Sequence, residues 1–111
     1  IASGGLAQAY AAVRRTFPDV DIQVEVTTVA EALEAYDAGA RFIMCDNMSV
    51  ALLGETVAAL RAQDEPVEIE ATGGLTLEVA RDYALTGVDY LSVGGLTHSS
   101  PILDLALDLI D

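Results

Sequence analysis

Basic residues are scarce in this chain of 111 residues. It contains no lysine and only five arginines against eighteen Asp and Glu, which gives a formal net charge of −13. Nucleic acids and membrane surfaces are bound by clustered cations, so this balance argues against both kinds of partner. No apolar run approaches the ~18 residues of a membrane span, and the first residues lack the basic-then-apolar pattern of a signal peptide.

Cysteine and length set further limits. The single cysteine, Cys45, excludes a framework of internal disulfides and fits a reducing, cytoplasmic location. Apolar residues make up 52% of the chain, so it can bury a core, but a complete eight-stranded α/β barrel needs ~250 residues. The chain begins at Ile1 rather than Met, and we therefore expect residues 1–111 to be one part of a longer polypeptide.

Helical periodicity recurs along the chain. Apolar residues spaced as on one face of a helix predict five helices, with their apolar stripes in the core, within residues 6–17, 29–40, 53–60, 79–83 and 103–110. Residue types that begin or end helices flank these segments: Thr28 with Glu31 as a capping box, Ser49, Thr76, Gly39 and Gly87.

Short segments rich in Val, Ile and Tyr lie between the helices and predict strands at residues 21–26, 41–46, 67–71 and 88–93. Strands that alternate with helices at this spacing are parallel and joined by crossover helices. The fold class is therefore α/β. The pattern fits either half of an α/β barrel or a small, open, doubly wound sheet.

Ligands of α/β folds bind at the carboxyl ends of the strands. Here these ends carry Glu25, Asp46, the run Thr72–Gly74 and the pair Gly94–Gly95. Glycines before a helix allow backbone N–H groups to approach an anion, which favours phosphate binding over plain turns. His98 follows the second pair, where it can donate to a phosphate, cap a helix or have no chemical role.

Strand alternation places polar side chains on one face of two predicted strands: Gln23 and Glu25, then Glu68, Glu70 and Thr72. Inside a barrel, such carboxylates need a ligand, a metal or a hydrogen-bond network. The alternative is an edge strand with a solvated second face. Cys45 is interpreted as a core residue, and the helical acids Glu34, Asp37 and Glu55 as a solvated surface.

The five arginines fall on predicted helices or at the start of a strand, away from the strand ends. An anionic ligand at those ends would therefore need a divalent metal, or basic residues from other sequence or another subunit.

Three stretches carry a family resemblance: IQVEVTTVAEALEAYDAGARFIMCDNMS, IEATGGLTLEVARDYALTGVDYLSVGGLTHS and LDLALDL. They resemble the C-terminal half of quinolinate phosphoribosyltransferase, and the likeness extends over essentially the whole chain. It implies a homodimer whose subunits combine an N-terminal open sandwich with a C-terminal, incomplete, TIM-like α/β barrel. Residues 1–111 would be the C-terminal half of that barrel domain, without the sandwich or the first barrel half. The implied reaction, with Mg²⁺, converts quinolinate and phosphoribosyl pyrophosphate to nicotinate mononucleotide, pyrophosphate and CO₂ in NAD biosynthesis.

The resemblance also implies roles for single residues. Glu25 and Asp46 match the catalytic acids that hold the ribose hydroxyls, directly or through Mg²⁺, and offset positive charge on C1. Thr72, Gly73 and Gly74 match the loop around the 5-phosphate, while Gly94, Gly95 and His98 match a second phosphate loop. The chain departs from the family at three positions: Thr72 replaces serine, Gly95 stands where alanine is common, and Gln23 where many members have an acid.

The family's basic residues for the dicarboxylate are absent from these 111 residues, so the isolated chain should not transfer phosphoribosyl groups. Two other functions stay open at this stage. One is a different phosphate-binding α/β-barrel enzyme, such as a molybdenum-associated relative. The other is a non-catalytic half-barrel whose open sheet edge pairs with another chain.

Overall fold

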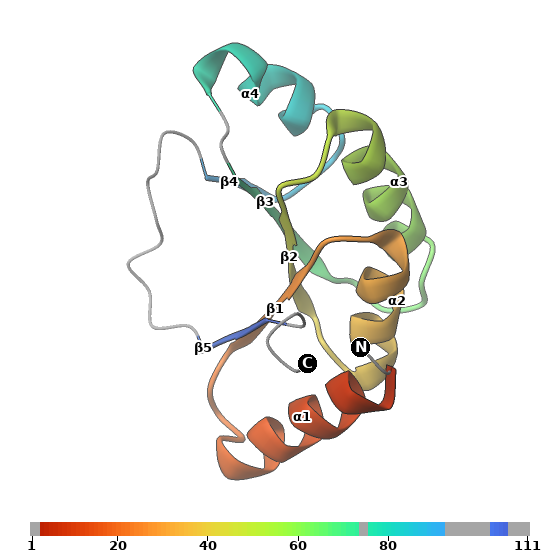
Figure 1. Ribbon diagram of the computed structural model, residues 1–111, viewed down its shortest axis with the longest axis vertical. Coiled ribbons are helices and arrows are strands. Elements are labelled where there is room, and N and C mark those ends of the chain that lie inside the picture. The colour runs from red at the N-terminus through yellow and green to blue at the C-terminus, as the bar shows by residue number, and fades with distance from the viewer. Residues whose placement is uncertain (1–2, 74–75, 93–102, 107–111) are drawn as a thin grey trace.

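Parallel strands and helices alternate along the chain (Figure 1). The computed structural model describes residues 3–73, 76–92 and 103–106. The elements in these ranges are α1 (Ser3–Thr16), β1 (Ile22–Val26), α2 (Val29–Ala38), β2 (Phe42–Asp46), α3 (Val50–Arg61), β3 (Glu68–Thr72), α4 (Leu77–Ala84), β4 (Tyr90–Leu91) and β5 (Leu103–Ala106).

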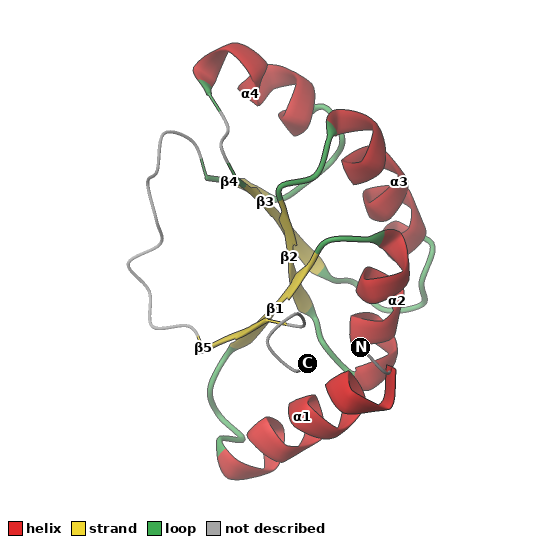
Figure 2. Ribbon diagram, in the orientation of Figure 1, coloured by secondary structure: helices red, strands yellow, loops and turns green. Residues whose placement is uncertain are grey.

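The strands form one parallel sheet in the order β4-β3-β2-β1-β5. From β1 to β4, each successive strand is added on the same side of the previous one. The described helices all lie on one face of the sheet, and the other face is left uncovered by them (Figure 2). A doubly wound sheet carries helices on both faces, whereas one-sided cover with a constant direction is typical of α/β barrels. The predicted TIM-like α/β fold class is therefore confirmed.

The end of the chain corrects one prediction. Residues 103–110 were expected to form a helix, but Leu103–Ala106 form β5, which pairs in parallel with β1 and places Leu103 opposite Ile22. The sequence LDLALDL also alternates apolar and polar residues with period two, so its local pattern is compatible with a strand. The open edge of β1 supplies the hydrogen-bond partners that a sequence pattern cannot indicate.

The core lies between the helices and the covered face of the sheet. Ile22, Val24 and Val26 of β1 point into it, as alternation predicts. Two expected core residues are exposed instead: Phe17 (48%), which follows the end of α1, and Val79 (38%). α4 has a neighbouring helix on only one side, which explains the exposure of Val79 (Figure 1).

Helix termini follow most of the predicted signals. The hydroxyl of Thr28 accepts from Glu31 N (3.1 Å), and the hydroxyl of Ser49 caps α3 in the same way. Gly39 ends α2 with φ 113°, a left-handed conformation that favours glycine. Thr76 precedes α4 but makes no side-chain cap, so that expectation is wrong in part. Within the described ranges, no helix is long and apolar enough to cross a membrane.

Candidate functional site

Three predicted site residues lie along the carboxyl edge of the sheet. Asp46 and Thr72 end neighbouring strands and are directly opposite each other in the parallel register. Glu25 is the penultimate residue of β1 and is opposite Met44, one pleat before Asp46. Alternation directs all three side chains to the face that the helices leave uncovered. Each is partly exposed, so this edge presents two acids and a hydroxyl to a ligand.

The bend after β3 is held against the end of β2. Asn47, which follows Asp46, donates its backbone N–H to the carbonyl of Thr72 at 2.9 Å. Gly73 has φ 130°, and a Cβ at this position would lie 3.1 Å from the Cα of Asn47. This close approach and the left-handed backbone both require glycine at position 73. Asn47 itself has φ 55°, a conformation that asparagine tolerates. The acid of β2 and the predicted phosphate bend are thus adjacent.

Four other predicted site residues, Gly74, Gly94, Gly95 and His98, lie outside the described residues.

A buried polar cluster, which we call the inner triad, is centred on Glu70, which lies one pleat before Thr72 and level with Glu25 in the register. Glu70 of β3 is only 2% exposed, and its two carboxylate oxygens accept hydrogen bonds from Gln23 Nε2 and Ser92 Oγ, both at 2.8 Å. The sequence pattern correctly placed Gln23 and Glu70 on the uncovered face. The pattern left open whether such carboxylates bind a partner inside the barrel or lie on a solvated face. Glu70 is buried in a hydrogen-bond network.

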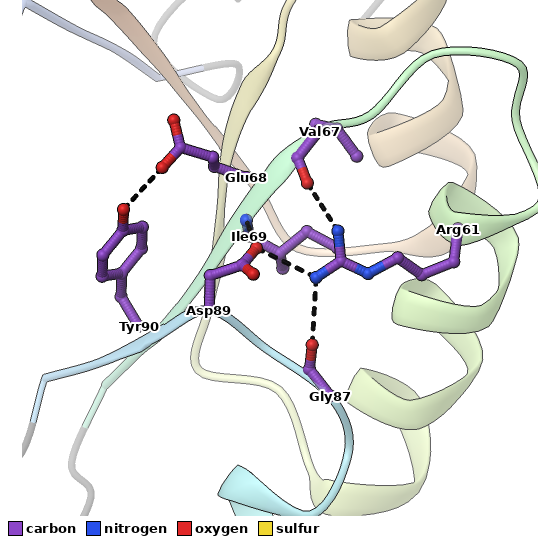
Figure 3. Close-up of polar contacts among 7 residues, drawn as sticks. All are labelled: Arg61, Val67, Glu68, Ile69, Gly87, Asp89 and Tyr90. Carbon is purple, nitrogen blue, oxygen red and sulfur yellow. Dashed lines mark hydrogen bonds and ion pairs between the residues drawn. The ribbon is translucent and has the colours of Figure 1, made fainter.

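Glu68, two residues earlier on β3, lies instead on a solvated part of the same face. It is exposed and accepts a hydrogen bond from the hydroxyl of Tyr90 at 2.5 Å (Figure 3). This hydrogen bond, together with the negative charge of Glu68, raises the pKa of Tyr90 above its ordinary value.

The amino ends of the strands are held by arginines. Arg61, the last residue of α3, donates to the carbonyls of Val67 (2.6 Å) and Gly87 (3.0 Å), and it pairs with Asp89 at 2.9 Å (Figure 3). The same carboxylate oxygen, Asp89 Oδ2, also accepts a hydrogen bond from the backbone N–H of Ile69, at 2.8 Å. These contacts fasten α3 to the starts of β3 and β4.

Two further arginines bind carbonyls that precede strands. Arg14 donates to Val20 O at 2.9 Å, just before β1, and Arg41 donates to Ala40 O at 2.7 Å, just before β2. Three of the five arginines therefore lie at the end of the sheet opposite the acids, as their sequence positions predicted.

The interpretations of Cys45 and of the three helical acids can be compared with the structure residue by residue. Cys45 is buried in the core, as expected, and burial raises the pKa of its thiol to about 12. Asp37 and Glu55 are exposed as expected, but Glu34 is not fully solvated. One of its carboxylate oxygens is buried with no hydrogen-bond partner in the described part of the chain.

The acids of the carboxyl edge can be tested for their fit to Mg²⁺. Nowhere in residues 3–73, 76–92 and 103–106 do three or more Asp, Glu, His or Cys side chains gather closely enough to hold a metal alone. Mg²⁺ usually keeps several waters and is bound through one or two carboxylates together with substrate phosphates. Glu25 and Asp46 fit a Mg²⁺ that binds with a phosphorylated substrate, rather than one held by protein ligands only.

Residues 1–108 match the profile of the family described as "Quinolinate phosphoribosyl transferase, C-terminal domain". The chain belongs to the quinolinate phosphoribosyltransferase family. It is 37% identical over 111 residues to the nicotinate-nucleotide pyrophosphorylase (carboxylating) of Rattus norvegicus, with 98% of this chain and 37% of that protein aligned. Its identity to the Mycobacterium leprae protein of the same name is 40%, over 97% of this chain and 38% of that one.

A solved structure agrees with the family assignment. The nicotinate-nucleotide pyrophosphorylase from Francisella tularensis superposes with a TM-score of 0.75 at 30% identity, over 90% of this chain and 35% of that protein. The chain therefore spans a little over a third of the length of these relatives.

Proposed function

We propose that this chain forms the phosphoribosyl-donor side of the active site of a carboxylating nicotinate-nucleotide pyrophosphorylase. The reaction converts quinolinate and phosphoribosyl pyrophosphate to nicotinate mononucleotide, pyrophosphate and CO₂, a step of NAD biosynthesis. One observation carries the proposal: the Asn47–Thr72 hydrogen bond of 2.9 Å, which brings Asp46 and the Gly73 bend together. Binding of a sugar phosphate requires a carboxylate that accepts hydrogen bonds from the sugar hydroxyls and, next to it, a turn that binds the phosphate. Membership of the family supports the assignment.

In this proposal the glycine bends hold the 5-phosphate of the donor. Thr72 contributes its hydroxyl, and Gly73 and Gly74 contribute backbone N–H groups. Absence of a Cβ lets phosphate oxygens approach these groups closely, and the N-terminus of the following helix adds a favourable dipole. Gly94, Gly95 and His98 form the second phosphate loop.

The two edge acids hold the ribose. Glu25 and Asp46 accept hydrogen bonds from its hydroxyls, and their negative charge stabilises the positive charge that develops on C1 as pyrophosphate leaves. Mg²⁺, held by the same two carboxylates directly or through water, would supply charge neutralisation at the leaving pyrophosphate. Both acids therefore act more strongly on the transition state than on the bound donor.

Recognition of quinolinate is assigned to residues outside this chain. A dicarboxylate needs several cations, but Arg14, Arg41 and Arg61 bind carbonyls at the opposite end of the sheet. We propose that the basic residues come from other sequence of a homodimeric, cytoplasmic enzyme. The isolated 111-residue chain is then inactive, and nicotinate mononucleotide formed by that chain alone would contradict this division of the site.

The test uses protein expressed from the complete gene that encodes this sequence. Nicotinate mononucleotide is measured by chromatography for the parent and for Glu25→Gln and Asp46→Asn, which keep the side-chain shapes and remove the charges. We expect kcat to fall by about 100-fold or more in each variant, the scale of losing one stabilising group in an active site.

Glu55→Gln is the matched control, because Glu55 is an exposed acid on α3, away from the edge. Its kcat should equal that of the parent. The assigned roles are wrong if both edge variants turn over at the parental rate, and the proposed reaction is wrong if the parent itself forms no nicotinate mononucleotide.

A further inference from the structure

The inner triad connects strands that are not neighbours. Gln23 is on β1 and Glu70 on β3, with β2 between these strands in the sheet. The 2.8 Å hydrogen bond from Gln23 Nε2 to Glu70 Oε1 therefore crosses β2 on the uncovered face. The bond from Ser92 Oγ to Glu70 Oε2, also 2.8 Å, extends the connection to the residue that follows β4. One side chain thus ties together three strands.

The position of the triad relative to the candidate site is regular. Gln23 lies two residues before Glu25, and Glu70 lies two residues before Thr72. Residues two apart on a strand point to the same face, so Glu70 lies one pleat before Thr72 on the uncovered face. It is level with Glu25, because Met44 of β2 lies opposite both residues. A shift at Glu70 is consequently transmitted along β1 to Glu25 and along β3 to Thr72.

The chemistry of the triad makes it a rigid support. Gln23 is 3% exposed and Glu70 2% exposed, and both oxygens of Glu70 accept hydrogen bonds. Buried polar groups joined in this way resist displacement, because breaking one of these hydrogen bonds leaves a buried polar group unsatisfied. A carboxylate held from two sides in this way fixes the spacing of the strands that supply its donors.

We infer that Glu70 is a positioning residue, which through Gln23 sets the distance between the ribose acid Glu25 and the phosphate bend at Thr72–Gly73. The inference rests on the proposed function, because the positions that Glu70 fixes matter only if Glu25 and the phosphate bend bind the phosphoribosyl donor. Glu70 does not touch the donor. Its substitution changes the alignment of the bound donor while the phosphate contacts remain.

The test measures kcat and the KM for phosphoribosyl pyrophosphate in protein expressed from the complete gene. In Glu70→Gln, one carboxylate oxygen becomes an NH₂ group. Directed at Gln23 it would face another NH₂ donor, and directed at Ser92 it would require the hydroxyl to turn and accept, so the contacts around residue 70 must rearrange. We expect kcat to fall by about 10- to 100-fold with KM within about threefold of the parent, since displacements near 1 Å have effects of this size. The double variant Gln23→Glu/Glu70→Gln exchanges the two groups, restores an amide–carboxylate hydrogen bond and should recover most of the lost kcat.

Glu68→Gln is the matched control. It makes the same chemical change on the same face of the same strand, two residues earlier, at an exposed side chain. Its constants should match those of the parent. Thermal unfolding of every variant separates effects on the active site from loss of folded protein. If Glu70→Gln does not fold, Gln23→Leu removes the same cross-strand bond and should show the same fall in kcat.

Two results would overturn the inference while the proposed function stands. One is a folded Glu70→Gln, or a folded Gln23→Leu in its place, with parental kcat and KM. The other is a Glu70→Gln defect that the exchanged pair does not repair, because a purely structural role predicts lower stability without rescue of turnover. A parent protein that binds no phosphoribosyl pyrophosphate in calorimetry and forms no product would instead refute the proposed function, and the inference with it.

Discussion

Replacing Gly73 by alanine tests the geometry on which the candidate site depends. A Cβ at this position would lie 3.1 Å from Asn47 Cα and 3.2 Å from Asn47 N, both backbone atoms that no side-chain rotation can move. The backbone of Gly73 has φ 130°, which L residues rarely adopt. Such a conformation costs about 1–3 kcal/mol, and overpacking adds a similar amount, so we expect a total cost of about 2–6 kcal/mol.

This cost is divided between folding and ligand binding. If the bend keeps its geometry in Gly73→Ala, the free energy of unfolding falls. If the bend relaxes instead, the Asn47–Thr72 bond is lost and phosphoribosyl pyrophosphate binds more weakly. Since 1.4 kcal/mol corresponds to a factor of ten, a cost expressed wholly in binding would raise Kd by about 30-fold at the lower bound and about 20,000-fold at the upper bound. Urea unfolding and calorimetric titration with the donor, performed on the same protein, measure both parts.

Gly54→Ala is the control for the glycine-to-alanine change. Gly54 lies within α3, and a Cβ there would meet nothing within 4 Å. Alanine is favoured over glycine inside a helix, so this variant should be more stable by about 0.5–1 kcal/mol and bind the donor as the parent does. The reasoning about the bend is refuted if Gly73→Ala changes the sum of the two free energies by less than about 0.5 kcal/mol, below the smallest cost expected of the strained backbone.

Two further predictions concern residues away from the edge. The Cys45 thiol, with its pKa raised to about 12 by burial, should resist iodoacetamide at pH 8 in the folded protein and react after unfolding; rapid labelling without unfolding would show that it is accessible. The unfolded thiol ionises near pH 9.0, so the unfolded state loses this proton first. The thiol should therefore lower the free energy of unfolding by about 1.4 kcal/mol per pH unit from there to pH 12, and Cys45→Ala should lose less stability over this range by that amount. Arg61→Ala should lower the free energy of unfolding by about 1–2 kcal/mol, because the partly exposed Arg61 holds two carbonyls and Asp89. The KM of Arg61→Ala for phosphoribosyl pyrophosphate should equal that of the parent. Arg81→Ala, which replaces an exposed arginine, is the control and should leave both the free energy of unfolding and the KM unchanged. Equal free energies of unfolding for the two variants would rule out the role given to Arg61.

Local patterns predicted the elements whose signals agree with one another. β1 and β2 were predicted to within one residue, because their apolar alternation is bounded by turns and capped helices. Leu103–Ala106 carried two compatible periodicities, and the choice between them depends on β1, about eighty residues away. Local sequence contains no information about that partner.

The candidate site divides in the same way. The rule that ligands lie at strand ends was enough to select Glu25, Asp46 and Thr72, which the sheet brings to one edge. The partner of Glu70 could not be predicted, because the Gln23–Glu70 bond joins residues that are neither close in sequence nor on adjacent strands. The left-handed backbone of Asn47 was also missed, although the asparagine directly after a strand was a usable signal.

The arginine contacts fasten the sheet at the amino ends of its strands, at the end away from the edge acids. A substitution at Arg61 removes three attachments at once, whereas one at Asp46 leaves the fastening of the scaffold intact. Evolution can therefore exchange an edge acid such as Asp46, and with it the ligand, at a smaller cost in folding stability than it can exchange Arg61.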